Sequence, residues 1–131
     1  MMVSVYELST GRILWHFRGS AHGAALQIAD GRGVVAGEHP PRLYWVIGGE
    51  VAARPQIIPP PDGSLPVGAD WTVPMVPAGT KVWLDGEHVG TSEADEALVI
   101  AFPLPGLWRV ELRPPWPWQD ASWEVDVTHA D

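Results

Sequence analysis

The chain has 131 residues, in which eight lysines and arginines stand against sixteen aspartates and glutamates, for a formal net charge of −8. A charge of this sign repels a phosphate backbone, so we expect no direct nucleic-acid partner. Cysteine is absent, which excludes disulfides, thiol catalysis and thiolate metal sites within these residues. The first seventeen residues contain Glu7 and Arg12, and no apolar run approaches the length of a bilayer span. We therefore expect neither a signal peptide nor a membrane span.

The charged fraction and the tryptophan content are both unusual. Charged residues make up 18% of the chain, below the about 25% of ordinary domains, and eight tryptophans are many for this length. One explanation is that other protein covers much of the surface. The other is a GC-rich gene, which enriches Gly, Ala, Pro, Arg and Trp whatever the function. Composition alone leaves both explanations open.

Residues 1–55 predict a small N-terminal β module. Val3–Leu8 and Arg12–Phe17 are rich in β-branched and aromatic residues, and the turn residues between them predict a first hairpin. Val34–Ala36 predicts a further short strand. Leu43–Ile47 and Glu50–Arg54 flank Gly48-Gly49, which predicts a second hairpin with a tight turn.

The intervening segment, residues 19–33, is rich in Gly and Ala. Within it, Ala24–Ala29 is compatible with one helical turn or with a short strand, and the pattern does not decide between them.

Residues 56–70 predict a proline-rich linker. Five prolines lie between Pro55 and Pro66, around the turn sequence Asp62-Gly63-Ser64. Proline breaks helices and central strands, so neither element is expected to persist. Proline also stiffens an extended chain, so we expect a semi-rigid spacer.

Residues 71–131 predict an immunoglobulin-like β-sandwich, which makes the chain mainly β. Trp108, Val110 and Leu112 alternate with charged residues, as on a half-buried antiparallel strand, and Asp85-Gly86 marks a β-hairpin. The spacing of the short strands is typical of a sandwich. The expected strands are 71–73, 80–84, 87–90, 97–102, 107–112 and 122–127.

No set of residues predicts a catalytic, cofactor or metal site. The five histidines are dispersed, without the i, i+4 or i, i+2 spacing of a zinc site. The acidic group Glu93, Asp95 and Glu96 is interpreted as a solvated loop between strands. No residues combine a nucleophile with a base and an orienting group, so we expect a protein that is not an enzyme and that has no cofactor.

The segment Pro114–Trp118 is an aromatic cluster in which prolines interrupt the strand pattern. Rigid tryptophan faces are common at binding hot spots and on sugar-stacking platforms, which favours a contact role for Trp116 and Trp118. The alternative is a plug, in which both indoles fold back over the sandwich core. Three other tryptophans, Trp83, Trp108 and Trp123, occupy alternating strand positions and are expected in the core.

Short segments in both halves, chiefly Thr10–Ile13, Leu43–Val51 and Val82–Gly86, together resemble small tail-fibre-associated and distal tail proteins of tailed bacteriophages. In the first half these are Thr10–Ile13 (Thr-Gly-Arg-Ile), Leu43–Val51 (Leu-Tyr-Trp-Val-Ile-Gly-Gly-Glu-Val) and the following Arg54-Pro55. In the second half they are Val76–Thr80, Val82–Gly86, Pro105–Val110 and Pro115–Pro117, which look like the immunoglobulin-like module found after that start. The stretch from Ala78 to Gly86 also resembles PEGA-type surface domains. The Trp-Pro-Trp sequence departs from the family, where a single aromatic residue is expected after the proline.

The resemblance implies a virion component of the phage tail, at the tail tip, baseplate or fibre attachment, that is assembled in the host cytoplasm. Its partners would be other tail proteins, in multiple copies. It would act by docking, with exposed strand edges and the proline-tryptophan loop packed on neighbouring subunits. The expected interface residues are Trp45, Arg113, Trp116 and Trp118. Two alternatives are a sandwich that binds a host surface glycan through Trp116 and Trp118, and a chaperone of tail-fibre assembly.

Overall fold

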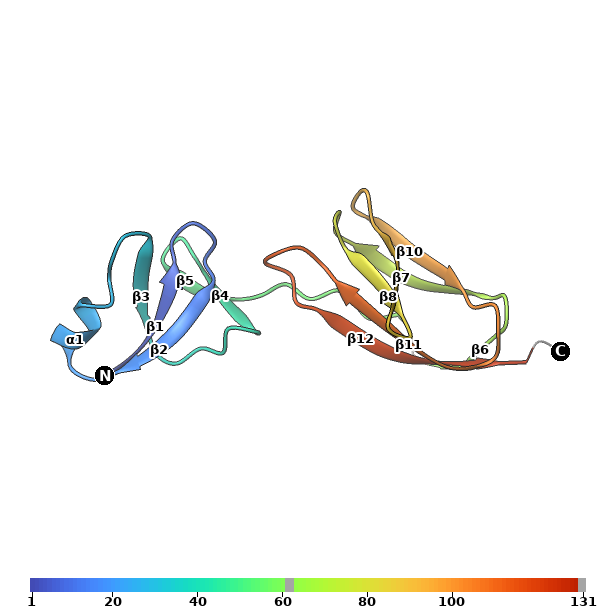
Figure 1. Ribbon diagram of the computed structural model, residues 1–131, viewed down its shortest axis with the longest axis horizontal. Coiled ribbons are helices and arrows are strands. Elements are labelled where there is room, and N and C mark those ends of the chain that lie inside the picture. The colour runs from blue at the N-terminus through green and yellow to red at the C-terminus, as the bar shows by residue number, and fades with distance from the viewer. Residues whose placement is uncertain (61–62, 130–131) are drawn as a thin grey trace. The chain divides into compact units, whose positions relative to one another are not determined.

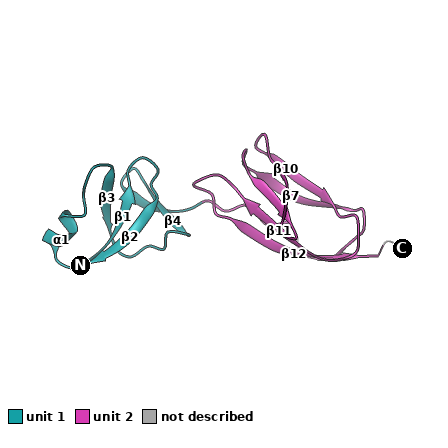
Figure 2. Cartoon of the chain, in the orientation of Figure 1, with its two compact units in different colours: residues 1–54 teal, residues 55–131 magenta. Residues whose placement is uncertain are grey.

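A computed structural model describes residues 1–60 and 63–129 of the chain. The chain divides into two compact units, residues 1–54 and residues 55–131 (Figure 2). Both are built almost entirely from β-strands, so the predicted mainly β fold class is confirmed (Figure 1).

Unit 1 contains two small antiparallel sheets. The first has the order β2-β1-β3, and the second pairs β4 with β5. Both predicted hairpins are confirmed, with strand ends within about one residue of the expected positions, a shift that assignment of strand ends commonly shows. The strands are β1 (Met2–Glu7), β2 (Ile13–Arg18), β3 (Arg32–Ala36), β4 (Tyr44–Ile47) and β5 (Glu50–Ala53).

For residues 24–29 the sequence left open a helical turn or a short strand, and the structure shows a short helix that covers only the first two of these residues. The helix α1 spans Ala21–Ala25, so it begins before the expected segment. Ser20 caps it, because its hydroxyl oxygen accepts a hydrogen bond from the backbone N–H of Gly23 at 3.1 Å. Serine at this position satisfies a backbone donor that the first helical turn leaves without a partner.

Unit 2 contains two sheets that share one hydrophobic core. A five-stranded sheet has the order β6-β12-β11-β8-β9, and a two-stranded sheet pairs β10 with β7. The strands are β6 (Leu65–Pro66), β7 (Asp70–Val76), β8 (Lys81–Leu84), β9 (Glu87–Thr91), β10 (Glu96–Ala101), β11 (Gly106–Arg113) and β12 (Ala121–Thr128). The Asp85-Gly86 hairpin is confirmed between β8 and β9.

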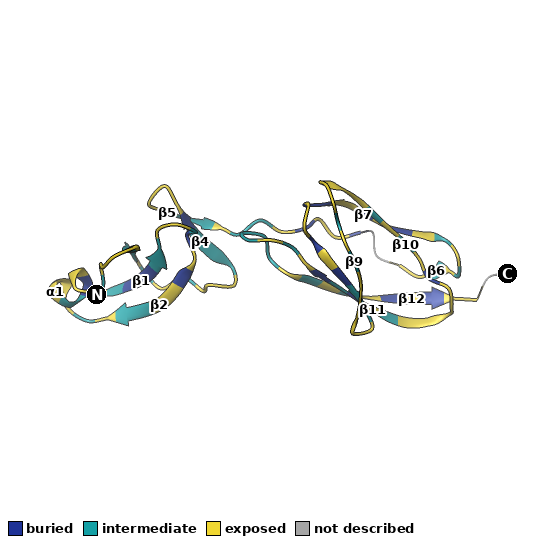
Figure 3. Ribbon diagram, turned by 45° about the horizontal axis from the view of Figure 1, so that its top comes forward, coloured by how far each residue is buried: buried dark blue, intermediate teal, exposed yellow. Residues whose placement is uncertain are grey.

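The core of unit 2 takes side chains from both sheets, and the buried residues of these strands are dark blue in Figure 3. Val73 on β7 and Val110 and Leu112 on β11 are completely buried. Trp108 packs against this core, so the predicted alternation along β11 is confirmed. Two sheets thus contribute to one core, while the immunoglobulin-like sandwich remains a prediction.

The segment predicted as a linker, residues 56–70, belongs to unit 2 in the structure. Ile57 is buried in the core, and β6 runs parallel to the end of β12. Proline excludes this segment from a central strand but does not prevent an edge pairing or a buried side chain. Residues 61–62 of the expected linker and residues 130–131 of the expected sandwich lie outside the described residues.

Candidate interaction surface

An open cleft in unit 2 lies between β9 and β10, which belong to different sheets. Its volume is about 430 Å³, and its lining is dominated by aliphatic side chains. Val76 and Val82 contribute from the core, and Val89 on β9 and Val99 on β10 belong to the two bordering strands. The cleft is therefore an apolar opening in the side of unit 2.

The two valines on the borders of the cleft are strongly exposed for apolar residues. Val89 on β9 is 53% exposed and Val99 on β10 is 52% exposed. The neighbours Leu98 and Ile100 pack against the core, which turns Val99 outward because side chains alternate along a strand. Packing of β10 thus forces an apolar side chain into solvent.

Both bordering strands are sheet edges. β9 ends the five-stranded sheet, and β10 pairs only with β7 among the described residues. Along β10, Val99 lies opposite Thr72, and the pairing shifts register between Glu96 and Leu98. An edge strand presents N–H and C=O groups on its outer side that can accept a further strand.

Acidic side chains lie at the start of β10. Glu96 lines the cleft, and Glu93 and Asp95 are exposed in the preceding loop, where the sequence predicted them. Asp95 also has a structural role, because its Oδ1 accepts a hydrogen bond from the backbone N–H of Ala78 at 2.8 Å. No group of three or more His, Cys, Asp or Glu residues within 1–60 and 63–129 is arranged to hold a metal ion.

The four expected interface residues are divided between the units. Trp45 lies on β4 of unit 1, where it is half-buried with its ring against Gly11. Arg113, Trp116 and Trp118 lie at or after the end of β11 in unit 2. Trp118 packs against the core, as the plug interpretation predicts, and Trp116 is half-buried. A contact role for these four residues remains a prediction.

Two tryptophans predicted in the core pack against it, and the third does not. Trp108 and Trp123 contact the core, whereas Trp83 lies opposite Glu111 on the other face of the sheet. The guanidinium of Arg113 stacks over the Trp83 ring at 4.5 Å from its centroid. The prediction for Trp83 was wrong because alternation alone does not reveal which face of a strand is buried.

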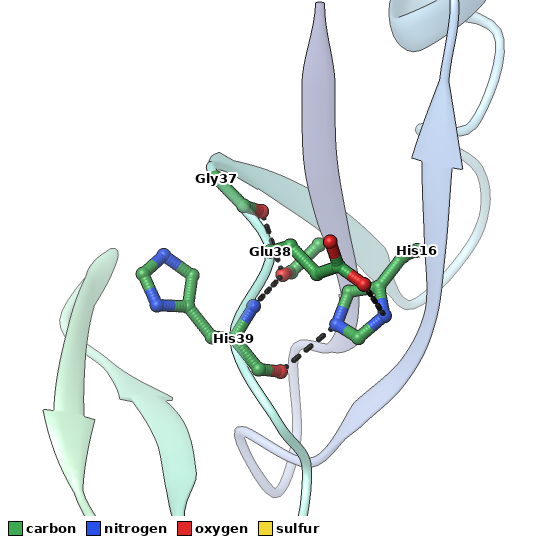
Figure 4. Close-up of polar contacts among 5 residues, drawn as sticks. His16, Gly37, Glu38 and His39 are labelled. Carbon is green, nitrogen blue, oxygen red and sulfur yellow. Dashed lines mark hydrogen bonds and ion pairs between the residues drawn. The ribbon is translucent and has the colours of Figure 1, made fainter.

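A polar cluster in unit 1 joins Ser4 and His16 to the loop after β3, and Figure 4 shows His16, Gly37, Glu38 and His39 of this cluster. The hydroxyl of buried Ser4 donates to the carbonyl oxygen of Gly37 at 2.9 Å and accepts from the N–H of His39 at 3.1 Å. His16 donates from Nε2 to the carbonyl oxygen of His39 at 2.9 Å, and its Nδ1 lies 3.9 Å from Glu38. Because the Ser4 hydroxyl is buried and bonded to backbone groups, the cluster holds the loop after β3 and does not present a nucleophile.

Comparisons with protein families, with curated proteins and with solved structures gave no match. Among the described residues, no helix has the length and apolar character needed to cross a membrane.

The sequence pattern did not predict Val89 and Val99 as surface residues. The signal that could have found them is the run Ala97–Ala101, which holds five apolar residues without a charge or proline. The sequence pattern predicted only that residues 97–102 form a short strand. It did not reveal that the strand lies at the edge of a two-stranded sheet.

Proposed function

We propose that this protein is a non-enzymatic docking protein that binds another protein through the cleft between β9 and β10. The observation that carries the proposal is the pair of exposed valines, Val89 and Val99, on two strand edges beside an apolar cleft. Water is removed from these side chains when a partner covers them, which favours association. Strand edges also offer backbone hydrogen bonds to the same partner.

We further propose that the docking serves the tail of a tailed phage, in which the protein is a structural component present in several copies. The resemblance of segments such as Leu43–Val51 and Val82–Gly86 to tail proteins supports this setting. The surface cleft supports the docking step. The two supports are independent, so each has its own measurement.

A substitution at the cleft border tests the docking. Val99→Lys places a charge where a partner would cover an apolar side chain, and we expect it to reduce incorporation into purified particles at least about tenfold, since a buried unpaired charge opposes association. Leu107→Lys is the matched control, because Leu107 is 64% exposed on β11, lies outside the cleft and receives the same charge. Quantitative mass spectrometry of particles from the strain that carries the gene gives the readout.

The outcomes separate the two parts of the proposal. Normal incorporation of Val99→Lys would show that the exposed edge of β10 beside the cleft does not carry the docking. Absence of the unsubstituted protein from mature particles would overturn the role as a resident tail component, and its presence only during assembly would support the chaperone alternative. The glycan alternative receives no specific support, because Trp118 packs against the core.

A further inference from the structure

The middle of β10 lacks the features that usually protect a strand edge. Natural edge strands carry charges, prolines or bulges that prevent another strand from adding to them. In β10 the register shift and the charge both occur at its start, near Glu96. The following five residues, Ala97–Ala101, are all apolar. This segment has the composition of a strand that pairs with another strand.

The two sheets of unit 2 differ in extent on the side of the cleft. The five-stranded sheet extends past β8 to β9, whereas the other sheet stops at β10. The cleft lies between these two edges, with apolar walls from Val82, Leu84 and Val89. A strand added to β10 would place alternate side chains toward this cleft, since side chains along a strand point to opposite faces.

Charge favours a partner with basic residues at one end of that strand. Glu93, Asp95 and Glu96 gather at the start of β10. A second copy of this chain would carry a net charge of −8 to an acidic surface, so like charges oppose self-association here.

We infer that the partner contributes an extended apolar segment, flanked by lysine or arginine, that pairs with β10 as the third strand of its sheet. This inference rests on the proposed docking function and names the kind of partner. Backbone hydrogen bonds to β10 supply the register, and the cleft receives every second side chain of the added strand. The basic flank lies beside Glu96.

Peptides with blocked backbone donors test this pairing directly. The probe is a synthetic peptide of about eight residues, enough to span β10, that alternates valine and threonine and carries two lysines at one end, with the lysines at either terminus in separate peptides. Each peptide is also made with its odd-numbered or its even-numbered backbone nitrogens methylated. Because N–H groups of alternate residues point to opposite strand edges, we expect methylation of one set to abolish binding and methylation of the other set to preserve it.

Binding is measured by titration of the isotopically labelled full chain, with backbone amide shifts and hydrogen exchange as readouts. Strand addition slows exchange at alternate residues of β10 by about tenfold or more, because their N–H groups gain partners. The matched peptide with glutamates in place of the lysines is expected to bind at least about tenfold more weakly. Leu107→Lys is expected to bind like the unsubstituted chain, and Val99→Lys more weakly.

Several results would overturn the inference. These are equal binding of the two methylated forms, shifts that fall outside β9 and β10, equal binding of the glutamate peptide, or no binding of any peptide. Self-association through β10, detected by sedimentation, would also overturn it by naming a second copy as the occupant. If the peptide results fail but Val99→Lys is still excluded from particles, the inferred strand pairing is wrong while the proposed docking function stands.

Discussion

Gly11 connects the two sheets of unit 1 at the end of the first hairpin. Its carbonyl oxygen accepts a hydrogen bond from the N–H of Val46 on β4 at 2.9 Å. Its φ of 77° lies in the left-handed region, and a Cβ built on it would lie 2.1 Å from the carbonyl oxygen of Val46. Both the backbone angle and the close approach therefore require glycine.

We expect Gly11→Ala to lower the free energy of unfolding of unit 1 by more than about 2 kcal/mol. The left-handed conformation alone costs about 1–2 kcal/mol for alanine, and the clash of its Cβ with the backbone of Val46 adds to this cost. Gly48→Ala is the control, since Gly48 has a φ of 60° but no atom within 4 Å of its added Cβ. Gly48→Ala should lower the free energy of unfolding only by the cost of the left-handed backbone conformation. Urea unfolding of both variants measures the difference, and equal losses would contradict a role for the close approach.

At the scale of elements, the proline-rich segment 56–70 is attached to unit 2 and is not a free spacer. The prolines were predicted to exclude helices and central strands, and the segment forms only the short edge strand β6, while Ile57 anchors it in the core of unit 2. The N–H of Gln119 also donates to the carbonyl oxygen of Pro55 at 2.9 Å. The segment is thus attached at its beginning by a backbone bond and by a buried side chain.

Neighbouring isoleucines provide a matched test of this attachment. Ile57 is 5% exposed and Ile58 is 64% exposed. We expect Ile57→Ala to destabilise the protein by about 2–5 kcal/mol because it leaves a cavity in the core. Ile58→Ala should change stability by less than about 0.5 kcal/mol, since its side chain is already in water. Chemical denaturation measures both, and a free spacer would make the two substitutions equally neutral.

At the scale of the whole molecule, the two units have cores of very different size. Unit 2 buries ten hydrophobic residues, whereas in unit 1 only five of the described hydrophobic residues are buried. At this size a core supplies only about 3–5 kcal/mol, so a difference of a few side chains matters. Unit 2 is therefore the main source of stability.

Separate expression of residues 1–54 and 55–131 tests this difference. We expect the second fragment to unfold cooperatively in urea and at a higher midpoint than the first, because more apolar surface leaves water when it folds. A fragment of residues 71–131 is the control, since it lacks Ile57 and β6 and should be less stable than residues 55–131. A higher midpoint for residues 1–54 would contradict the assignment of stability to unit 2.

The sequence by itself determined the hairpins and most strands. Gly48-Gly49 and Asp85-Gly86 define their turns because backbone angles with positive φ are local properties of a few residues. Alternation in β11 likewise revealed one buried face, since a strand repeats every two residues. These features depend on neighbours in the chain.

Only the tertiary structure decided which edges and faces are covered. It placed Ile57 in a core, Trp83 on the face opposite Val82, and Val99 at a strand edge. Burial depends on contacts between residues far apart in the chain, and the local pattern is the same for a central strand and an edge strand. For that reason the sequence indicated a β-rich docking protein, while the cleft between β9 and β10 became visible only when the sheets were assembled.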